Sequence, residues 1–416
     1  MSGTSGGVGR GAGTRRMGRR VDGAAGKRGA WAAPGAHGVG RLAAMIVALV
    51  VALFLLLAGE ARAGFYEVAQ CGWGVGAEAD WWDSTGGVKF RPDSGCGDHL
   101  KTFTRGGAGT LTGGRLARWR WVAPPTTNIR AFRATWWQVL NDGFVHVVGG
   151  WPAGGDFGVA GITGSTNLTP SEFNDVFTPS VPIVEDRIVC WRPDTEWCAL
   201  DPESWSAIRN VTVTIDDGYP PGAWITGGTL TDGGWRRGSQ FVSFSGHDDG
   251  SGVRFGETTI DGGRVGLDEY PCAAAVIEGV LRATQMRPCY TDVSGTLTID
   301  TTRLGDGPHT LDHCAYDFAG TESCAGARTV YIDNNPPGAP NGLRVDGGEA
   351  WRRTDDFAVE WSDPDQGAAS PIAIAYLRLR GPGGYDSGDA NRYPGAGVAK
   401  ITGARVPGDG DWTAWV

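Results

Sequence analysis

The sequence lacks the short motifs of the common catalytic and metal centres. It contains no HExxH zinc motif, no GxSxG nucleophile elbow, no P-loop and no CxxC pair. Histidine is scarce at six residues, and only His309 and His313 could share one face of a short segment. On a strand these two lie about 13 Å apart, too far for one metal ion. We therefore expect no catalytic residue, no metal centre and no cofactor.

Helical periodicity is nearly as scarce. Only residues 273–285 (AAAVIEGVLRATQ) and 171–177 (SEFNDVF) have patterns suited to a helical turn or two. Glycine is abundant at 69 residues but has no collagen-like period, and 18 tryptophans are too many for a disordered chain. Alternating segments such as 114–124, 128–140 and 186–192 are typical of strands. The composition therefore predicts a turn-rich, all-β protein.

Residues 1–63 differ from the rest in charge and hydropathy. A basic lead is followed by an uncharged apolar run over 42–59 and then by Ala61-Arg62-Ala63. This order is typical of a secretory signal peptide, and we expect cleavage after Ala63. The alternative is an uncleaved membrane anchor, because an apolar run of about 18 residues reaches the lower limit for a transmembrane helix. In both cases residue 64 onward is expected outside the cytoplasm, with membrane contact only through this segment.

The net charge supports the same division. Residues 1–63 hold nine Lys/Arg and two Asp/Glu, whereas the whole chain carries a formal charge of −9. The exported part is therefore strongly acidic. Nucleic-acid binding through phosphates requires clustered Lys and Arg, so we expect no nucleic-acid partner.

All eight cysteines follow residue 63, which favours disulfide bonds over zinc ligands or free buried thiols. Two turn sequences, 193–195 and 317–320, lie midway between cysteines, so hairpins there would place the paired cysteines opposite each other. The spacings favour four local bonds: Cys71–Cys96, Cys190–Cys198, Cys272–Cys289 and Cys314–Cys324.

Two junctions along the chain share one phrase, Ile-Asp and a polar stretch followed by Pro-Pro-Gly-Ala, at 211–228 and 328–348. Prolines cannot continue a β ladder and stiffen a connection. Asp216 and Asp333 are 117 residues apart, which suits one small sandwich domain. We therefore expect three β-sandwich modules, at 64–215, 216–333 and 334–416.

The second module resembles a bacterial immunoglobulin-like (Ig-like) domain. The residues that carry the resemblance are Asp-Asp-Gly-Ser-Gly-Val at 248–253 and the closing hairpin at 315–320, without the antibody-type cystine packed on a tryptophan. The third module resembles a fibronectin type III domain through the proline-rich opening at 336–340, Trp361 and Tyr376. Because the phrase GDGPHTL of 305–311 returns as GDGDWTA at 408–414, we expect the third module to be incomplete, with its last strand missing.

The first module is similar to the N-terminal module of secreted actinobacterial multidomain proteins, through the opening at 66–71 and the exit VTVTIDD. The resemblance implies a jelly-roll or concanavalin-A-like sandwich and no established activity. We therefore expect tandem β-sandwiches, jelly-roll-like, Ig-like and incomplete fibronectin type III-like, after the signal or transmembrane segment.

Tryptophans make the first module the candidate binding module. Eleven of the 18 tryptophans lie in 64–215, and flat aromatic rings stack on the apolar faces of sugars. Trp119 and Trp121 share one face of a strand and are expected in the core. We expect Trp81 and Trp82 to lie on a surface loop and to form a ligand-binding surface with Glu78 and Asp80.

The same segment also suggests an enzyme. Glu78 to Asp83 resembles the Glu-x-Asp-x-x-Glu pattern of one family of retaining glucanases, with Asp83 in place of the final glutamate. Retaining hydrolysis needs two carboxyl groups about 5 Å apart. We prefer a non-catalytic extracellular protein for adhesion, carbohydrate binding or envelope structure, with a glycan or cell-envelope polymer as partner, and keep a glycoside hydrolase in 64–215 as the alternative.

Calcium at the module junctions is a further possibility. Asp216 with Asp217, and Asp333 with Asn334 and Asn335, offer the oxygen ligands that calcium prefers. Asp and Asn are also ordinary turn residues before proline, which is the reading we adopt.

Overall fold

The computed structural model describes residues 64–416, except 94, 97–98, 108, 142, 152–159, 164–165 and 396. The leader expected over 1–63 lies outside the described residues, so the signal peptide and the membrane anchor stay predictions. Within the described part of the chain, no helix is long and apolar enough to cross a membrane. The described chain is nearly all β, and its helices are three 3₁₀ segments of three residues each, as the all-β prediction required.

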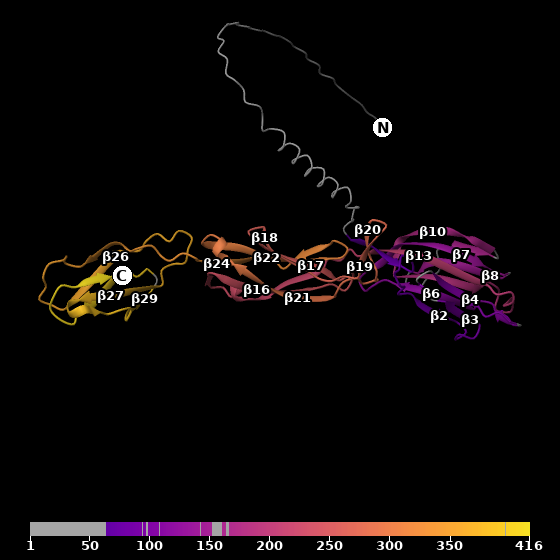
Figure 1. Ribbon diagram of the computed structural model, residues 1–416, viewed down its shortest axis with the longest axis horizontal. Coiled ribbons are helices and arrows are strands. Elements are labelled where there is room, and N and C mark those ends of the chain that lie inside the picture. The colour runs from indigo at the N-terminus through magenta and orange to yellow at the C-terminus, as the bar shows by residue number, and fades with distance from the viewer. Residues whose placement is uncertain are drawn as a thin grey trace, which may run out of the picture. The chain divides into compact units, whose positions relative to one another are not determined.

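The first module is built from two large, mainly antiparallel sheets (Figure 1). One sheet has the order β10-β7-β13-β1-β20-β19, with β4 pairing to β13 and β3 to β4; the other has the order β2-β6-β11-β8-β9. A two-stranded sheet pairs β12 with β5. The strands are β1 (Phe65–Gln70), β2 (Asp80–Asp83), β3 (Phe90–Asp93), β4 (Leu100–Thr104), β5 (Thr110–Thr112), β6 (Leu116–Val122), β7 (Asn128–Val139), β8 (Phe144–Trp151), β9 (Ala160–Thr163), β10 (Thr166–Val181), β11 (Ile183–Cys190), β12 (Trp197–Ala199) and β13 (Trp205–Asp216).

The core of this module lies between the two large sheets. Trp119 and Trp121 alternate along β6 and are both buried, as predicted from their shared face. The ring of Trp121 lies 5.0 Å from that of Phe132 on β7, in the opposite sheet. Side chains from both sheets therefore fill one apolar cluster, which is the packing of a β-sandwich.

Two strands of the larger sheet of the first module come from the second module, far along the chain from the other strands of that sheet. Residues 273–285, whose pattern suited a helical turn or two, instead form the hairpin β19 (Ala274–Ile277) and β20 (Val280–Ala283). Glu278 and Gly279 make its turn with φ of 53° and 81°, a conformation that suits a two-residue hairpin and not a helix. Val68 of β1 pairs in parallel with Ala283 of β20, so the hairpin extends the sheet of the first module. Residues 171–177 likewise lie in strand β10 and not in a helical turn.

The second module contributes two further sheets, in the orders β14-β16-β21 and β15-β24-β22-β17-β18, with β23 pairing to β22. Val242, Leu311 and Ile332 are among the buried residues between them. The strands are β14 (Gly222–Gly227), β15 (Trp235–Arg236), β16 (Ser239–His247), β17 (Val253–Ile260), β18 (Gly263–Glu269), β21 (Asp292–Asp300), β22 (Gly307–Asp317), β23 (Glu322–Cys324) and β24 (Arg328–Ile332); η1 (Thr229–Thr231) and η2 (Thr301–Arg303) are 3₁₀ segments.

The third module has a core of its own. Trp361 is 7% exposed and packs with Leu377 and Ile401, whereas Tyr376 is 42% exposed. Strand β27 pairs with β28, with β29 and with β31. The elements are β25 (Asn341–Val345), β26 (Asp356–Ser362) and β30 (Lys400–Arg405) in one sheet, β27 (Ile374–Gly381), β28 (Tyr385–Asp386), β29 (Asn391–Pro394) and β31 (Thr413–Trp415) in the other, and η3 (Pro382–Gly384).

Three of the four predicted disulfide bonds are formed: Cys190–Cys198, Cys272–Cys289 and Cys314–Cys324. Cys314 and Cys324 stand directly opposite each other on β22 and β23, as the turn between them predicted. The fourth predicted bond is not formed, and Cys71 and Cys96 are both thiols. They are neighbours, because a hydrogen bond from Cys71 lowers the pKa of the Cys96 thiol below its ordinary value.

Candidate functional site

The tryptophans expected on a loop lie on an edge strand. Trp81 and Trp82 belong to β2, the outermost strand of the five-stranded sheet, so their side chains point to opposite faces. Trp81 packs against the buried clusters of the module. Trp82 is 48% exposed, and the guanidinium of Arg118 lies 4.8 Å from the centre of its ring. Of the two, only Trp82 offers a ring face near solvent, and that face has a cation beside it.

The three nearby carboxylates are each engaged with a different partner. Asp83 is buried and accepts hydrogen bonds from Thr85 and Gly87, so it fastens its own turn. Glu78 accepts a hydrogen bond from the backbone N–H of Met286 in the second module. Asp80 is exposed and lies 3.6 Å from Arg120. The three carboxylates thus have separate partners.

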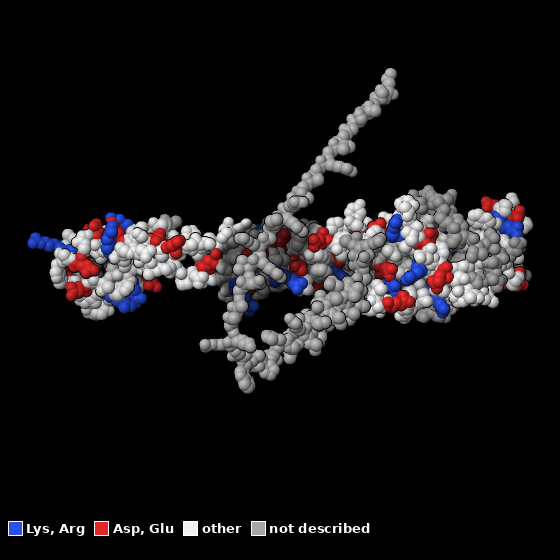
Figure 2. All heavy atoms as spheres, turned by 90° about the horizontal axis from the view of Figure 1, so that it is seen from above, with Lys and Arg blue, Asp and Glu red and all other residues white. Residues whose placement is uncertain are grey.

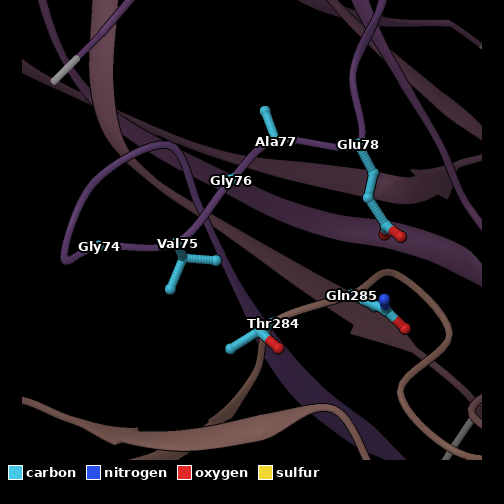
Figure 3. Close-up of a pocket in the computed structure, with 7 residues that line it drawn as sticks. All are labelled: Gly74, Val75, Gly76, Ala77, Glu78, Thr284 and Gln285. Atoms are coloured by element: carbon cyan, nitrogen blue, oxygen red, sulfur yellow. The ribbon is translucent and has the colours of Figure 1, made fainter. Parts of the chain in front are cut away.

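Glu78 also borders a shallow pocket of about 390 Å³ between a loop of the first module and the segment after β20 (Figure 3). The lining residues are Gly74, Val75, Gly76, Ala77, Glu78, Thr284 and Gln285. Figure 3 shows the Glu78 side chain pointing from its loop toward Gln285. Small residues and backbone dominate this lining, and no aromatic side chain takes part in it.

Contacts around β20 fasten the first two modules to each other. The Tyr66 hydroxyl donates to the carbonyl of Met286 at 2.6 Å, and its ring meets that of Phe318 edge-on at 5.8 Å. Arg282, which is almost fully buried, places its Nε 2.7 Å from the Glu67 carboxylate. Met286 and Phe318 belong to the same buried cluster as the first module's core. Residues on both sides of the predicted boundary at 215/216 thus share one core.

Among the first module's tryptophans whose exposure the structure describes, the two most exposed lie elsewhere. Trp191 and Trp197 are 69% and 63% exposed, and each is one residue inside the Cys190–Cys198 disulfide. The two cysteines are themselves buried, so the bond anchors the loop to the core while its tryptophans face outward. The sequence carried a signal for this surface, because each tryptophan is adjacent to a cysteine of a predicted disulfide that spans a turn.

Backbone contacts hold this loop, 190–198, in one conformation. The N–H of Trp191 donates to the carbonyl of Gly143 at 2.7 Å, and that of Glu196 to Pro193 at 2.8 Å. A Cβ at Gly113 would lie 2.1 Å from the carbonyl oxygen of Arg192, so only glycine lets the neighbouring turn approach. Two aromatic side chains are thereby presented on a fixed frame, which lowers the entropic cost of binding.

On the face that Figure 2 shows, the charged side chains do not gather into a patch that would suggest a second ligand-binding surface. Lys and Arg lie interspersed with Asp and Glu there, without a large patch of either sign among the described residues. Aromatic exposure is therefore the better guide to a ligand surface.

No family model matches the chain, and no curated protein matches it. Among solved structures, the chicken CNTN1 FN1-FN3 domains align over 74% of this chain and 90% of that one, with 8% identity and a TM-score of 0.23. Dimeric latent PorU from Porphyromonas gingivalis aligns over 85% and 30%, with 10% identity and a TM-score of 0.17. The GH2 beta-galacturonidase from Eisenbergiella tayi aligns over 72% and 47%, with 9% identity and a TM-score of 0.16. With TM-scores this low, the three likenesses carry no argument about family or function.

Proposed function

We propose that the chain is an extracytoplasmic, non-catalytic binding protein, secreted or held at the cell surface, that attaches to a glycan of the cell envelope or its surroundings. The observation that carries this proposal is the disulfide-closed loop 190–198 with its two outward-facing tryptophans. Three disulfide bonds in the chain favour an oxidising compartment.

The contacts of the acidic residues favour binding over hydrolysis. Retaining hydrolysis needs two carboxyl groups that face one sugar bond, one of them a free nucleophile. Glu78 is instead bound to the backbone of the second module, and Asp83 to its own turn. The glycoside hydrolase in 64–215 stays the alternative function.

The proposal is tested with residues 64–416 produced in an oxidising compartment and screened against a glycan array and insoluble wall polysaccharides. We expect binding that falls about 10-fold or more when Trp191 and Trp197 are both replaced by alanine, since exposed aromatic contacts commonly contribute more than 1 kcal/mol each. Trp351→Ala is the matched control, because this tryptophan is 80% exposed but lies in the third module.

Three other outcomes would contradict the proposal in whole or in part. Absence of binding to every polysaccharide contradicts the glycan assignment, and unchanged binding by the double variant removes loop 190–198 from it. Release of reducing sugar that disappears in Glu78→Gln would establish the hydrolase in its place.

A further inference from the structure

Three aspartates from separate strand ends meet inside the second module. Asp217 follows β13, Asp248 follows β16, and Asp317 ends β22 (Figure 1). All three are buried, with exposed fractions of 0%, 5% and 0%. One carboxylate oxygen from each lies within 4.8 Å of the other two. Buried carboxylates that approach each other in this way require a compensating charge or proton.

One oxygen of this cluster accepts no hydrogen bond. Asp217 Oδ1 is buried and has no partner among the described residues, whereas its Oδ2 accepts from the N–H of Ser251 at 2.8 Å. A buried acceptor without a partner costs free energy, so its retention needs an explanation. An ion held between the three carboxylates supplies one.

The other carboxylate oxygens are held in place by their own loops. Asp248 accepts from the N–H of Gly252 at 2.6 Å, and Asp317 accepts from the N–H of Thr321 at 2.7 Å. Each carboxylate has about four lone-pair sites, so these bonds orient the group and leave capacity for a further contact. Gly250 allows the close approach, because a Cβ there would lie 2.6 Å from Asp217 Oδ2.

No arginine or lysine forms an ion pair with the three aspartates in the described part of the chain. The nearest histidine along the chain, His247, is directed to Asp292 and Asp249, at 2.8 Å and 3.4 Å. The cluster thus has an unbalanced negative charge, which a divalent cation would neutralise.

We propose that Asp217, Asp248 and Asp317 bind one calcium ion next to the junction of the first two modules. Calcium takes oxygen ligands at about 2.4 Å, so two oxygens on opposite sides of one ion are up to about 4.8 Å apart. Magnesium holds its ligands at about 2.1 Å and keeps several waters, which suits a buried three-carboxylate site less well. The burial of all three carboxylates therefore favours calcium, because magnesium is seldom held in a cage made of protein oxygens alone.

The site differs from the one that the sequence suggested. Asp217 takes part, but its neighbour Asp216 lies 3.3 Å from the hydroxyl of Ser180. At the second junction, Asn334 bonds to Thr301, and Asp333 accepts from Ser370, so the two junctions are not equivalent.

The test uses residues 64–416, freed of metal with a chelator and then titrated with CaCl₂ or MgCl₂. We expect calcium binding with a Kd of about 0.1–1 mM by calorimetry, as for extracellular modules, and a rise of about 2–3 °C in Tm at 10-fold excess over Kd. Terbium luminescence provides a second measurement of occupancy that does not depend on stability.

Asp217→Asn and Asp317→Asn are expected to weaken calcium binding at least 10-fold and to abolish the rise in Tm. The metal-free variants should fold, because each substitution removes a repulsive charge. Asp249→Asn is the matched control, because Asp249 lies in the same loop but outside the cluster and should bind calcium normally.

The proposal is overturned if neither calcium nor terbium binds at millimolar concentration, or if Asp217→Asn binds calcium like the unaltered chain. An equal affinity for magnesium overturns the assignment to calcium.

Discussion

The two module junctions begin with the same sequence phrase but are built differently. Near residue 216, a hairpin from the second module extends the first module's sheet, and one apolar cluster contains residues of both. Near residue 333, the buried cluster of the third module contains only its own residues, and that of the second module likewise. The same phrase thus precedes two different arrangements, and at the first of them a hairpin distant in sequence is added to the preceding sheet.

The largest effect is expected from the core of the third module. Trp361→Ala should cost about 3–5 kcal/mol, since it removes a large buried ring, and it should lower one calorimetric transition while the transition of the first two modules stays in place. The exposed Trp351→Ala is the control. If the midpoints of all transitions fall together, the third module unfolds with the first two, and the proposed difference between the two junctions is wrong.

The next effect concerns the base of the hairpin that joins the first two modules. Cys272 and Cys289 are 17 residues apart, so replacing both by serine should cost about 3 kcal/mol through the loop entropy of the unfolded chain. Amide hydrogen exchange at β1 should become faster. The Cys314→Ser/Cys324→Ser variant removes a disulfide whose cysteines are 10 residues apart within the second module, and it should leave β1 protected. Equal loss of protection in both variants would mean that the hairpin does not join the modules.

A smaller effect is expected from pH. His313 is buried against Phe244, with ring centres 4.1 Å apart, and burial lowers its pKa to about 4. The unfolded chain then binds the proton more readily, so stability should fall by about 2 kcal/mol as pH decreases from about 6.5 to 4. His313→Gln should lose this part of the pH dependence. The third module's transition should keep its pH dependence unchanged; a parallel change there would contradict the separation of the modules.

The smallest effect compares two ion pairs. The Arg282–Glu67 pair crosses the first junction, and its arginine is 6% exposed; the Arg344–Glu360 pair lies in the third module, and its arginine is 72% exposed. Double-mutant cycles with Arg282→Met and Glu67→Gln should give a coupling of about 1 kcal/mol. The exposed pair should give less, because water and salt screen it. A larger coupling in the third module would reverse the order proposed for the junctions.

Local patterns in the sequence predicted the strands and most of the disulfide bonds. Trp119 and Trp121 alternate with polar residues, and the alternation placed both in the core. The turn at 317–320 aligned Cys314 with Cys324. These predictions held because each depends on residues that are close along the chain.

The parts that could not be predicted depend on long-range contacts. Residues 273–285 have an apolar pattern that suits either a helical turn or a short hairpin, and the edge of a distant sheet decides between them. The three clustered aspartates are spread over a hundred residues, in loops where aspartate is ordinary. Trp81 packs against the core from edge strand β2, whose pairing with β6 its own segment does not reveal.

The parallel contact between β1 and β20 has a consequence for how the chain can be divided. Cutting the chain at residue 215 would remove Ala283 from beside Val68 and expose that edge of β1. An exposed strand edge can pair with another chain, so we expect such a fragment to self-associate more readily than the longer chain. The hairpin thus covers part of an edge that would otherwise be open, and the first two modules are best produced together.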